Sequence, residues 1–171
     1  SFSSKSRLFS PDISHDGNMV VAVELLPEQE SKLHVLGNDG QPRTVIDTKD
    51  DLVYAYPKFS AKDDAVFVVA RNAQGWSAIV KLDIASGKSE TIIPFSNRTL
   101  GFLHVQQDTL LFNASYKGQD QQFAYVLSSK SLYQLANYPT GVYQSALQKD
   151  GNLAASLFTA NGYQLASIKP S

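Results

Sequence analysis

Cysteine is absent from the 171 residues of this sequence. This absence excludes disulfide bonds, thiolate ligands for a metal and a cysteine nucleophile. It does not decide between compartments, because reducing and oxidising locations both accept a chain without cysteine. The composition itself, with 43% hydrophobic and 11% aromatic residues, is typical of a folded domain with an ordinary core.

An excess of charge of one sign and long apolar runs are also missing. Fifteen Lys and Arg residues stand against sixteen Asp and Glu, and the formal net charge is −1. Because the two signs are interleaved, there is no basic stripe for a nucleic acid and no polybasic anchor for a membrane surface. The longest apolar stretches, such as residues 65–70, have the length of a strand rather than the roughly 20 residues of a membrane span. We therefore expect no nucleic-acid partner and no insertion into a membrane.

Sustained helical periodicity is absent too, and most segments alternate with a period of two. Residues 52–93 read as one complete four-stranded antiparallel unit with polar turns. The expected strands are 52–59, 65–70, 77–84 and 90–93. Pro57 has no N–H to donate, so the first strand should bend or lie at a sheet edge, and Pro94 is expected to end the fourth strand.

The same unit recurs along the chain. Sliding it along the sequence aligns Val66 with Val20, Leu110 and Ala154, at successive offsets of 46, 44 and 44 residues. This is the period of a propeller blade. In the fourth copy Ala154 and its neighbour have low strand propensity, so the alignment there depends on the preceding Asp-Gly-Asn turn. The predicted blades are 6–47, 52–93, 100–135 and 142–171, the last of them incomplete.

The first two copies begin with a short signature, which the third copy has lost. Pro11 is followed by Asp-Ile-Ser-His-Asp-Gly and a β-rich run, and Pro57 by Lys-Phe-Ser-Ala-Lys-Asp and a similar run. This pattern resembles the repeat of TolB-type β-propellers. The resemblance implies an all-β fold of four-stranded blades that form part of a larger propeller, and an exported protein in the periplasm or outside the cell. Similar blades serve in periplasmic binding proteins, in the gating domains of prolyl oligopeptidase-like enzymes and beside metalloprotease domains.

Motifs for catalysis or for cofactor binding are lacking. The sequence has no Gly-x-Ser-x-Gly elbow, no His-Glu-x-x-His pair and no calcium loop with spaced carboxylates. The three histidines, His15, His34 and His104, fall at unrelated positions of the repeat. We therefore predict no catalytic residue, no metal site and no cofactor in this segment.

Connections between blades are the best place for binding residues, because loops on a rigid scaffold commonly carry function. The connections from the last strand of one copy to the first strand of the next are longer and more varied than the hairpins at the opposite end. The candidates for contact with a partner are Lys49, Asp50, Arg98 and Tyr138. Three aromatic residues near the start of the third strand, Trp76, Phe123 and Tyr163, are expected instead to pack between blades.

Two functions remain open from the sequence. The first is a non-catalytic module within a larger exported bacterial protein, which binds a protein or peptide or packs on a neighbouring domain of the same chain. The second is a propeller that filters substrates for a peptidase whose catalytic domain lies outside this segment. The incomplete fourth copy also suggests self-association through exposed terminal blades, since an unpaired strand and apolar surface favour it. A closed four-blade ring is the alternative.

Overall fold

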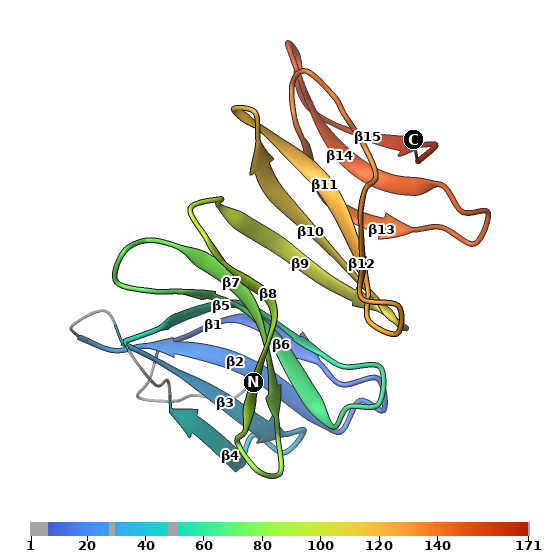
Figure 1. The fold of residues 1–171 in the computed structure, drawn as a ribbon. Coiled ribbons are helices and arrows are strands. Elements are labelled where there is room, and N and C mark those ends of the chain that lie inside the picture. The colour runs from blue at the N-terminus through green and yellow to red at the C-terminus, as the bar shows by residue number, and fades with distance from the viewer. Residues whose placement is uncertain (1–6, 28–29, 48–50, 171) are drawn as a thin grey trace. The chain divides into compact units, whose positions relative to one another are not determined.

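The computed structural model describes residues 7–27, 30–47 and 51–170. Within these residues the chain forms fifteen β-strands and no α-helix. Figure 1 draws the strands as arrows along the chain. The strands belong to two compact units, Ser1–Asn97 and Arg98–Ser171. The expectation of an all-β protein is confirmed.

Each unit contains two antiparallel sheets, whose strands follow one another in sequence order. The first sheet consists of β1 (Leu8–Ile13), β2 (Met19–Leu25), β3 (Ser31–Gly37) and β4 (Pro42–Asp47). The second consists of β5 (Val53–Phe59), β6 (Ala65–Arg71), β7 (Ser77–Asp83) and β8 (Ser89–Ser96). The third consists of β9 (Leu100–Gln106), β10 (Thr109–Tyr116), β11 (Gln119–Val126) and β12 (Ser131–Gln134). The fourth has only β13 (Val142–Leu147), β14 (Leu153–Thr159) and β15 (Gly162–Ile168).

The two prolines of the second sheet differ in their effect. β5 lies at a sheet edge, as expected from Pro57. Pro94, however, does not end a strand, because β8 continues through it to Ser96. β8 is also an edge strand, and its pairing with β7 is irregular between Ile93 and Ser96. Pro94 falls in this irregular stretch, where the ladder does not require its missing N–H.

The first strand of every sheet carries the same irregularity. Its pairing with the second strand omits two adjacent residues, so that two residues oppose one, which is a β-bulge. The first of the two has a positive φ in each sheet: Ser10 (50°), Tyr56 (51°), Phe102 (48°) and Gln144 (44°). A positive φ costs a residue other than glycine on the order of 1–3 kcal/mol, so its repetition at one position means that the surrounding sheet imposes it.

Counting from the bulge corrects the alignment of the fourth repeat. Phe59 pairs with Val66, whereas the equivalent residue Leu147 pairs with Leu153. Leu153 is therefore the counterpart of Val66, and the sequence-based alignment of Ala154 with Val66 was wrong by one residue.

A shorter turn causes this shift. In the second sheet the Ser60 N–H donates to the Ala65 carbonyl (2.8 Å), whereas in the fourth the Gln148 N–H donates to the Asn152 carbonyl (2.7 Å). The turn of the fourth sheet is thus one residue shorter. A slip of one residue moves every side chain of a strand to the opposite face. Leu153 is accordingly buried, and the neighbouring positions of β14 face the other way.

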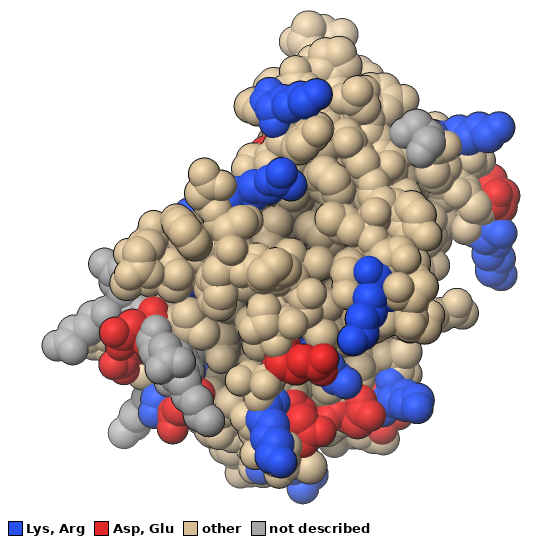
Figure 2. All heavy atoms as spheres, viewed as in Figure 1, with Lys and Arg blue, Asp and Glu red and all other residues tan. Residues whose placement is uncertain are grey.

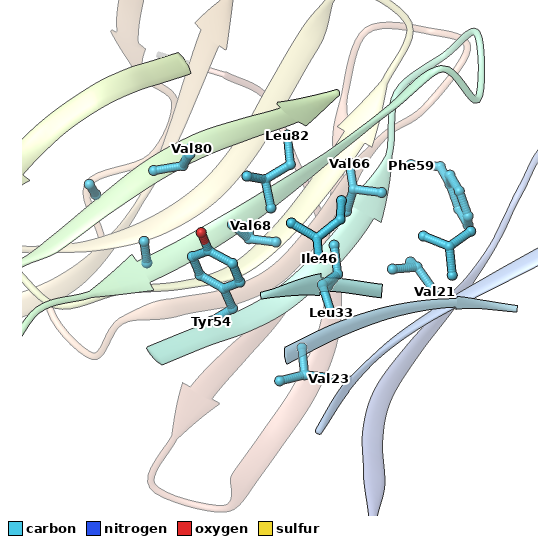
Figure 3. Close-up of a cluster of buried hydrophobic side chains, with 13 residues drawn as sticks. Val21, Val23, Leu33, Ile46, Tyr54, Phe59, Val66, Val68, Val80 and Leu82 are labelled. Carbon is cyan, nitrogen blue, oxygen red and sulfur yellow. The ribbon is translucent and has the colours of Figure 1, made fainter. Parts of the chain in front are cut away.

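An apolar core joins the first and second sheets (Figure 3). It contains Val21 and Val23 of β2, Leu33 of β3, and Val66 and Val68 of β6, all of which are fully buried. Burial of such a side chain contributes about 1.5–3 kcal/mol. Together these residues outweigh the strain of the bulges and hold the two sheets face to face.

Side chains also tie neighbouring sheets to each other at equivalent places. In the first unit, Asp12 accepts the Phe59 N–H (3.0 Å) and forms an ion pair with the Lys58 Nζ (2.8 Å). In the second unit, the Gln106 Nε2 donates to the Leu147 carbonyl, and the Leu147 N–H donates to the Gln106 Oε1, both at 3.0 Å. Phe59 and Leu147 hold the same position relative to the bulge. The backbone of the later sheet is thus fixed just after its bulge.

Replacement of Asp12 should destabilise the chain. Asp12→Ala leaves the Phe59 N–H without its acceptor, and we expect the free energy of unfolding to fall by about 1–3 kcal/mol. Asp12→Asn keeps an acceptor but loses the charge, so its effect should be smaller. Urea unfolding followed by circular dichroism measures both.

The matched control is Asp47→Ala, which removes an exposed ion pair with Lys32 (3.0 Å). Exposed pairs contribute little, so the unfolding midpoint should stay unchanged. Equal effects of Asp12→Ala and Asp47→Ala would contradict the role assigned to Asp12.

Candidate functional site

Two of the four sequence-predicted binding residues lie in the second unit. Arg98 precedes β9, and Tyr138 lies in the connection from β12 to β13. Lys49 and Asp50 lie outside the described residues. Among the described residues, the candidate site therefore lies around Arg98 and Tyr138.

Arg98 lies beside the tip of the β10–β11 hairpin. Its guanidinium carbon is 5.4 Å from the ring centroid of Tyr116, and the Lys117 Nζ is 5.3 Å from the same centroid. The neighbouring Thr99 carbonyl accepts the Ser115 N–H (3.0 Å), which fixes this connection against β10. Cation–π contacts at exposed sites are worth about 0.5–1 kcal/mol each. Two cations are thus gathered around one aromatic ring.

Tyr138 is held by a buried side-chain amide. The Gln121 Nε2 donates to the Tyr138 carbonyl (2.9 Å), and the Tyr138 N–H donates to the Gln121 Oε1 (3.1 Å). Gln121 is buried in β11, whereas 36% of Tyr138 remains exposed. The amide therefore acts as a bridge between the backbone of the connection and the third sheet, and the ring of Tyr138 stays on the surface.

Tyr143 belongs to β13 of the fourth sheet, directly after this connection. Its ring is edge-on to Phe102 (centroids 5.9 Å apart) and to Tyr163 (5.7 Å). Burial raises the pKa of Tyr143, and the charge and hydrogen bond of Asp120 raise this pKa further. Gly141, with φ at 91°, leaves room for the Tyr143 hydroxyl, which a Cβ there would meet at 2.9 Å.

These residues define one surface, which we name the loop end. It consists of Arg98, Tyr116, Lys117, Asp120 and Tyr138, around the tip of the β10–β11 hairpin. Over the part of the molecule that corresponds to β9–β15, Figure 2 shows mostly uncharged atoms, with a few separate basic groups and an acidic group at the edge. The loop end can therefore offer positive charge and aromatic surface to a partner.

Sequence reasoning missed Tyr116, Lys117 and Gln121. Tyr116 and Lys117 immediately precede Gly118, so the glycine turn was the signal that could have placed them beside a connection. The contact between Gln121 and Tyr138 has no comparable signal, since the two residues belong to different elements.

The three aromatic residues expected to pack between blades behave differently. Phe123 is buried and stacks on Phe112 with ring centroids 6.0 Å apart. Trp76 and Tyr163 are exposed, so the expectation was wrong for both. Trp76 lies in the turn before β7 rather than in the strand. Tyr163 shares a face of the fourth sheet with Phe158, opposite the face that carries the buried Leu153 and Ala155.

Two of the three histidines, His15 and His34, lie in separate polar pairs. The His15 Nδ1 is 2.9 Å from Asp63, and the His34 Nε2 is 2.7 Å from Glu24. No group of three or more His, Cys, Asp or Glu side chains that could hold a metal occurs among the described residues. The part of the chain that the structure describes also has no helix of the length and apolarity that a membrane span requires.

No family model and no curated protein sequence matches this chain. Several solved structures, however, match this chain in fold. TolB from Acinetobacter baumannii superposes with a TM-score of 0.72 at 17% identity, over 99% of this chain and 45% of that chain. A puromycin-hydrolyzing peptidase of Mycobacterium tuberculosis gives 0.67 at 14% identity, over 96% and 30%. Oligogalacturonate lyase from Vibrio parahaemolyticus gives 0.72 at 11% identity, over 99% and 52%.

These likenesses establish the fold. The chain is a TolB-like β-propeller module built from repeated blades, as the signature at Pro11 and Pro57 indicated. It spans about half the length of the TolB structure and less than a third of the peptidase. Since the matching proteins include TolB, a peptidase and a lyase, the fold does not specify the role of the module.

The environment of Tyr143 gives a testable titration. Asp120→Asn removes a negative charge next to the phenol, so the pKa of Tyr143 should fall towards its ordinary value. The difference in tyrosinate absorbance between each protein and its Tyr143→Phe variant isolates this residue.

The raised pKa of Tyr143 also makes the free energy of unfolding depend on pH. A pKa raised in the folded state stabilises the fold below the unfolded pKa, and this contribution is lost as the pH rises through the folded pKa. An unchanged titration of Tyr143 in Asp120→Asn would show that Asp120 does not act on it.

Proposed function

We propose that this chain is a non-catalytic propeller module that binds a protein or peptide segment through the loop end. It would do so within a larger exported bacterial protein, in the periplasm or outside the cell, as the TolB-like signature implies. Neighbouring domains of the same protein are further candidates for contact. The observation that supports the proposal most is the pair of cations, Arg98 and Lys117, around the ring of Tyr116.

The charges of the second unit favour an acidic partner. At the loop end, Arg98 and Lys117 stand against the single carboxylate of Asp120. The other two acidic residues of this unit are committed to turns away from it: Asp108 accepts the Ser128 N–H (3.2 Å), and Asp150 accepts the Asn152 N–H (3.0 Å). An extended peptide with carboxylates and aromatic side chains would therefore match both the charge and the rings of the loop end.

Rigidity of the loop end also supports a binding role. The Gln121 amide fixes the backbone at Tyr138, and the pairing of Thr99 with Ser115 fixes the connection that carries Arg98. A surface that is already ordered loses little conformational entropy when a partner binds. The exposed ring of Tyr138 would then contribute apolar contact at low cost.

The experiment uses three labelled ten-residue peptides that share two aromatic residues and differ in charge: acidic, neutral and basic. Fluorescence anisotropy should give the lowest Kd for the acidic peptide, and this Kd should rise with salt. The double variant Arg98→Ala/Lys117→Ala should weaken binding by about tenfold, which corresponds to about 1.4 kcal/mol.

Lys149→Ala is the matched control, since Lys149 lies in the turn at the opposite end of the fourth sheet. Its affinity for the acidic peptide should equal that of the wild type. Equal affinity for all three peptides, or an equal loss in Lys149→Ala, would rule out the loop end as the binding site.

The second candidate is a substrate-gating propeller of a peptidase, with the catalytic domain outside this segment. The likeness to the puromycin-hydrolyzing peptidase favours it. A Gly-x-Ser-x-Gly or His-Glu-x-x-His motif elsewhere in the same polypeptide would support this candidate. Hydrolysis of chromogenic peptides by the 171-residue chain, abolished by one substitution within it, would contradict both proposals.

A further inference from the structure

Two buried amides lie on the face of the third sheet that packs against the fourth. Asn113 of β10 and Gln122 of β11 are directly opposite each other in the ladder, so their side chains share this face. The Asn113 Nδ2 donates to the Val142 carbonyl of β13, which shows that the face is directed at the fourth sheet. Both sheets belong to the second unit, and both amides are buried within it. The contact between the two sheets is therefore polar at this point.

The first and second sheets are apolar at the same position. Counting from the bulge, the pair of Asn113 and Gln122 corresponds to four buried apolar residues, Val23 and Leu33 in the first sheet and Val69 and Ile79 in the second. The architecture of the repeat thus does not require polar side chains here. The two amides are a property of the third sheet.

Three atoms of these amides have no partner in the described part of the chain. They are the Asn113 Oδ1 and both the Nε2 and the Oε1 of Gln122. The hydroxyl of Ser145, which is buried in β13 on the facing sheet, also lacks a partner among the described residues. Buried polar groups in proteins are almost always hydrogen-bonded, to protein or to ordered water. A bound molecule is therefore needed to satisfy the amides.

The chemistry of the unpartnered atoms defines this molecule. The Gln122 Nε2 requires an acceptor, whereas the Gln122 Oε1 and the Asn113 Oδ1 require donors. A metal cation would meet the N–H groups of Gln122, and an anion would meet the two carbonyl oxygens. Water is neutral, donates and accepts, and typically makes about three hydrogen bonds where it is buried.

We propose that a water molecule is bound between the third and fourth sheets, where it bridges Gln122 and Asn113. The Gln122 Nε2 donates to this water, and the water donates to the Asn113 Oδ1. Side chains opposite each other in an antiparallel ladder have Cβ atoms about 4.5–5.5 Å apart, so one water can reach both amides. The water takes the place of the apolar contact found in the first two sheets. Because it is enclosed, it exchanges with solvent only when the two sheets part.

Oxygen-17 relaxation dispersion of the water signal tests this site, since it detects water molecules that stay inside a protein for a long time. The measurement compares the 171-residue chain with the variant Asn113→Val/Gln122→Leu, which carries the residues of the first sheet. The variant should lose at least one long-lived water. It should remain folded, because replacing both polar partners by apolar groups of similar shape is nearly neutral or stabilising.

Gln134→Leu is the matched control. Gln134 is a partly buried residue of β12 in the same sheet, and its Nε2 donates to the Ala136 carbonyl (3.2 Å). This variant changes an amide to the same apolar residue outside the proposed site, so it should keep every long-lived water of the wild type. A crystal structure of the wild type is the second measurement and serves if the double variant fails to fold. It should show a water within hydrogen-bond distance of the Gln122 Nε2 and the Asn113 Oδ1.

Three results would overturn the proposal. The first is an equal number of long-lived waters in the wild type and the folded double variant. The second is loss of the same water in Gln134→Leu, which would place it elsewhere in the sheet. The third is a crystal structure in which the amides of Asn113 and Gln122 bond directly to each other, with no water between them.

Discussion

The β-bulge in the first strand of each sheet is the constraint on which the rest of the structure depends. It recurs at Ser10, Tyr56, Phe102 and Gln144, each of which has a positive φ. In every case this residue and the next one in the same strand together oppose a single residue of the partner strand. None of the four is glycine, so the conformation is imposed by pairing on both sides of the bulge rather than by an intrinsic preference. The bulge sets which residues of the later strands face the neighbouring sheet.

Packing supplies the free energy that this strain requires. The buried valines and leucines between the first two sheets contribute far more than the ties at Asp12 and Gln106, each of which makes two polar contacts. The ties have a different effect. In each, a side chain of one sheet binds the backbone of the next sheet just after its bulge, and so fixes how the two sheets are aligned. Apolar burial thus stabilises the pair of sheets, and the polar ties select its register.

Much of the fold could be predicted from the sequence. The repeat is marked by strands rich in valine, isoleucine and phenylalanine and by Asp-Gly turns. In β6, for example, the apolar run 65–70 predicts a strand that is buried on both faces. The alignment failed where the signal is weakest. β14 has alanine at the diagnostic positions, and the length of its turn could be judged only from the hydrogen bond between Gln148 and Asn152. The prediction that Pro94 ends its strand was also wrong. A proline is tolerated within an edge strand such as β8, where the ladder does not require its missing N–H.

The site was predictable only in outline. Arg98 and Tyr138 were found because connections between blades vary, but the residues that give them their environment come from the β10–β11 hairpin. Contacts between Arg98 and Tyr116, or between Tyr138 and Gln121, join residues far apart in the sequence. Periodicity reports which face of a strand is apolar, and it contains no information on which turn lies beside which connection.

The register of the fourth sheet tests the account most directly, and the absence of natural cysteine makes the measurement simple. Ala146 lies opposite Ala154 on β14, whereas the alignment with Val66 as the counterpart of Ala154 would place it opposite Ala155. Two paired variants separate these registers, because a disulfide needs Cα atoms about 4.4–6.8 Å apart with side chains on the same face. Under mild oxidation, the account predicts that Ala146→Cys/Ala154→Cys forms an intramolecular disulfide and that Ala146→Cys/Ala155→Cys does not. The reverse result would contradict a register set by the bulge.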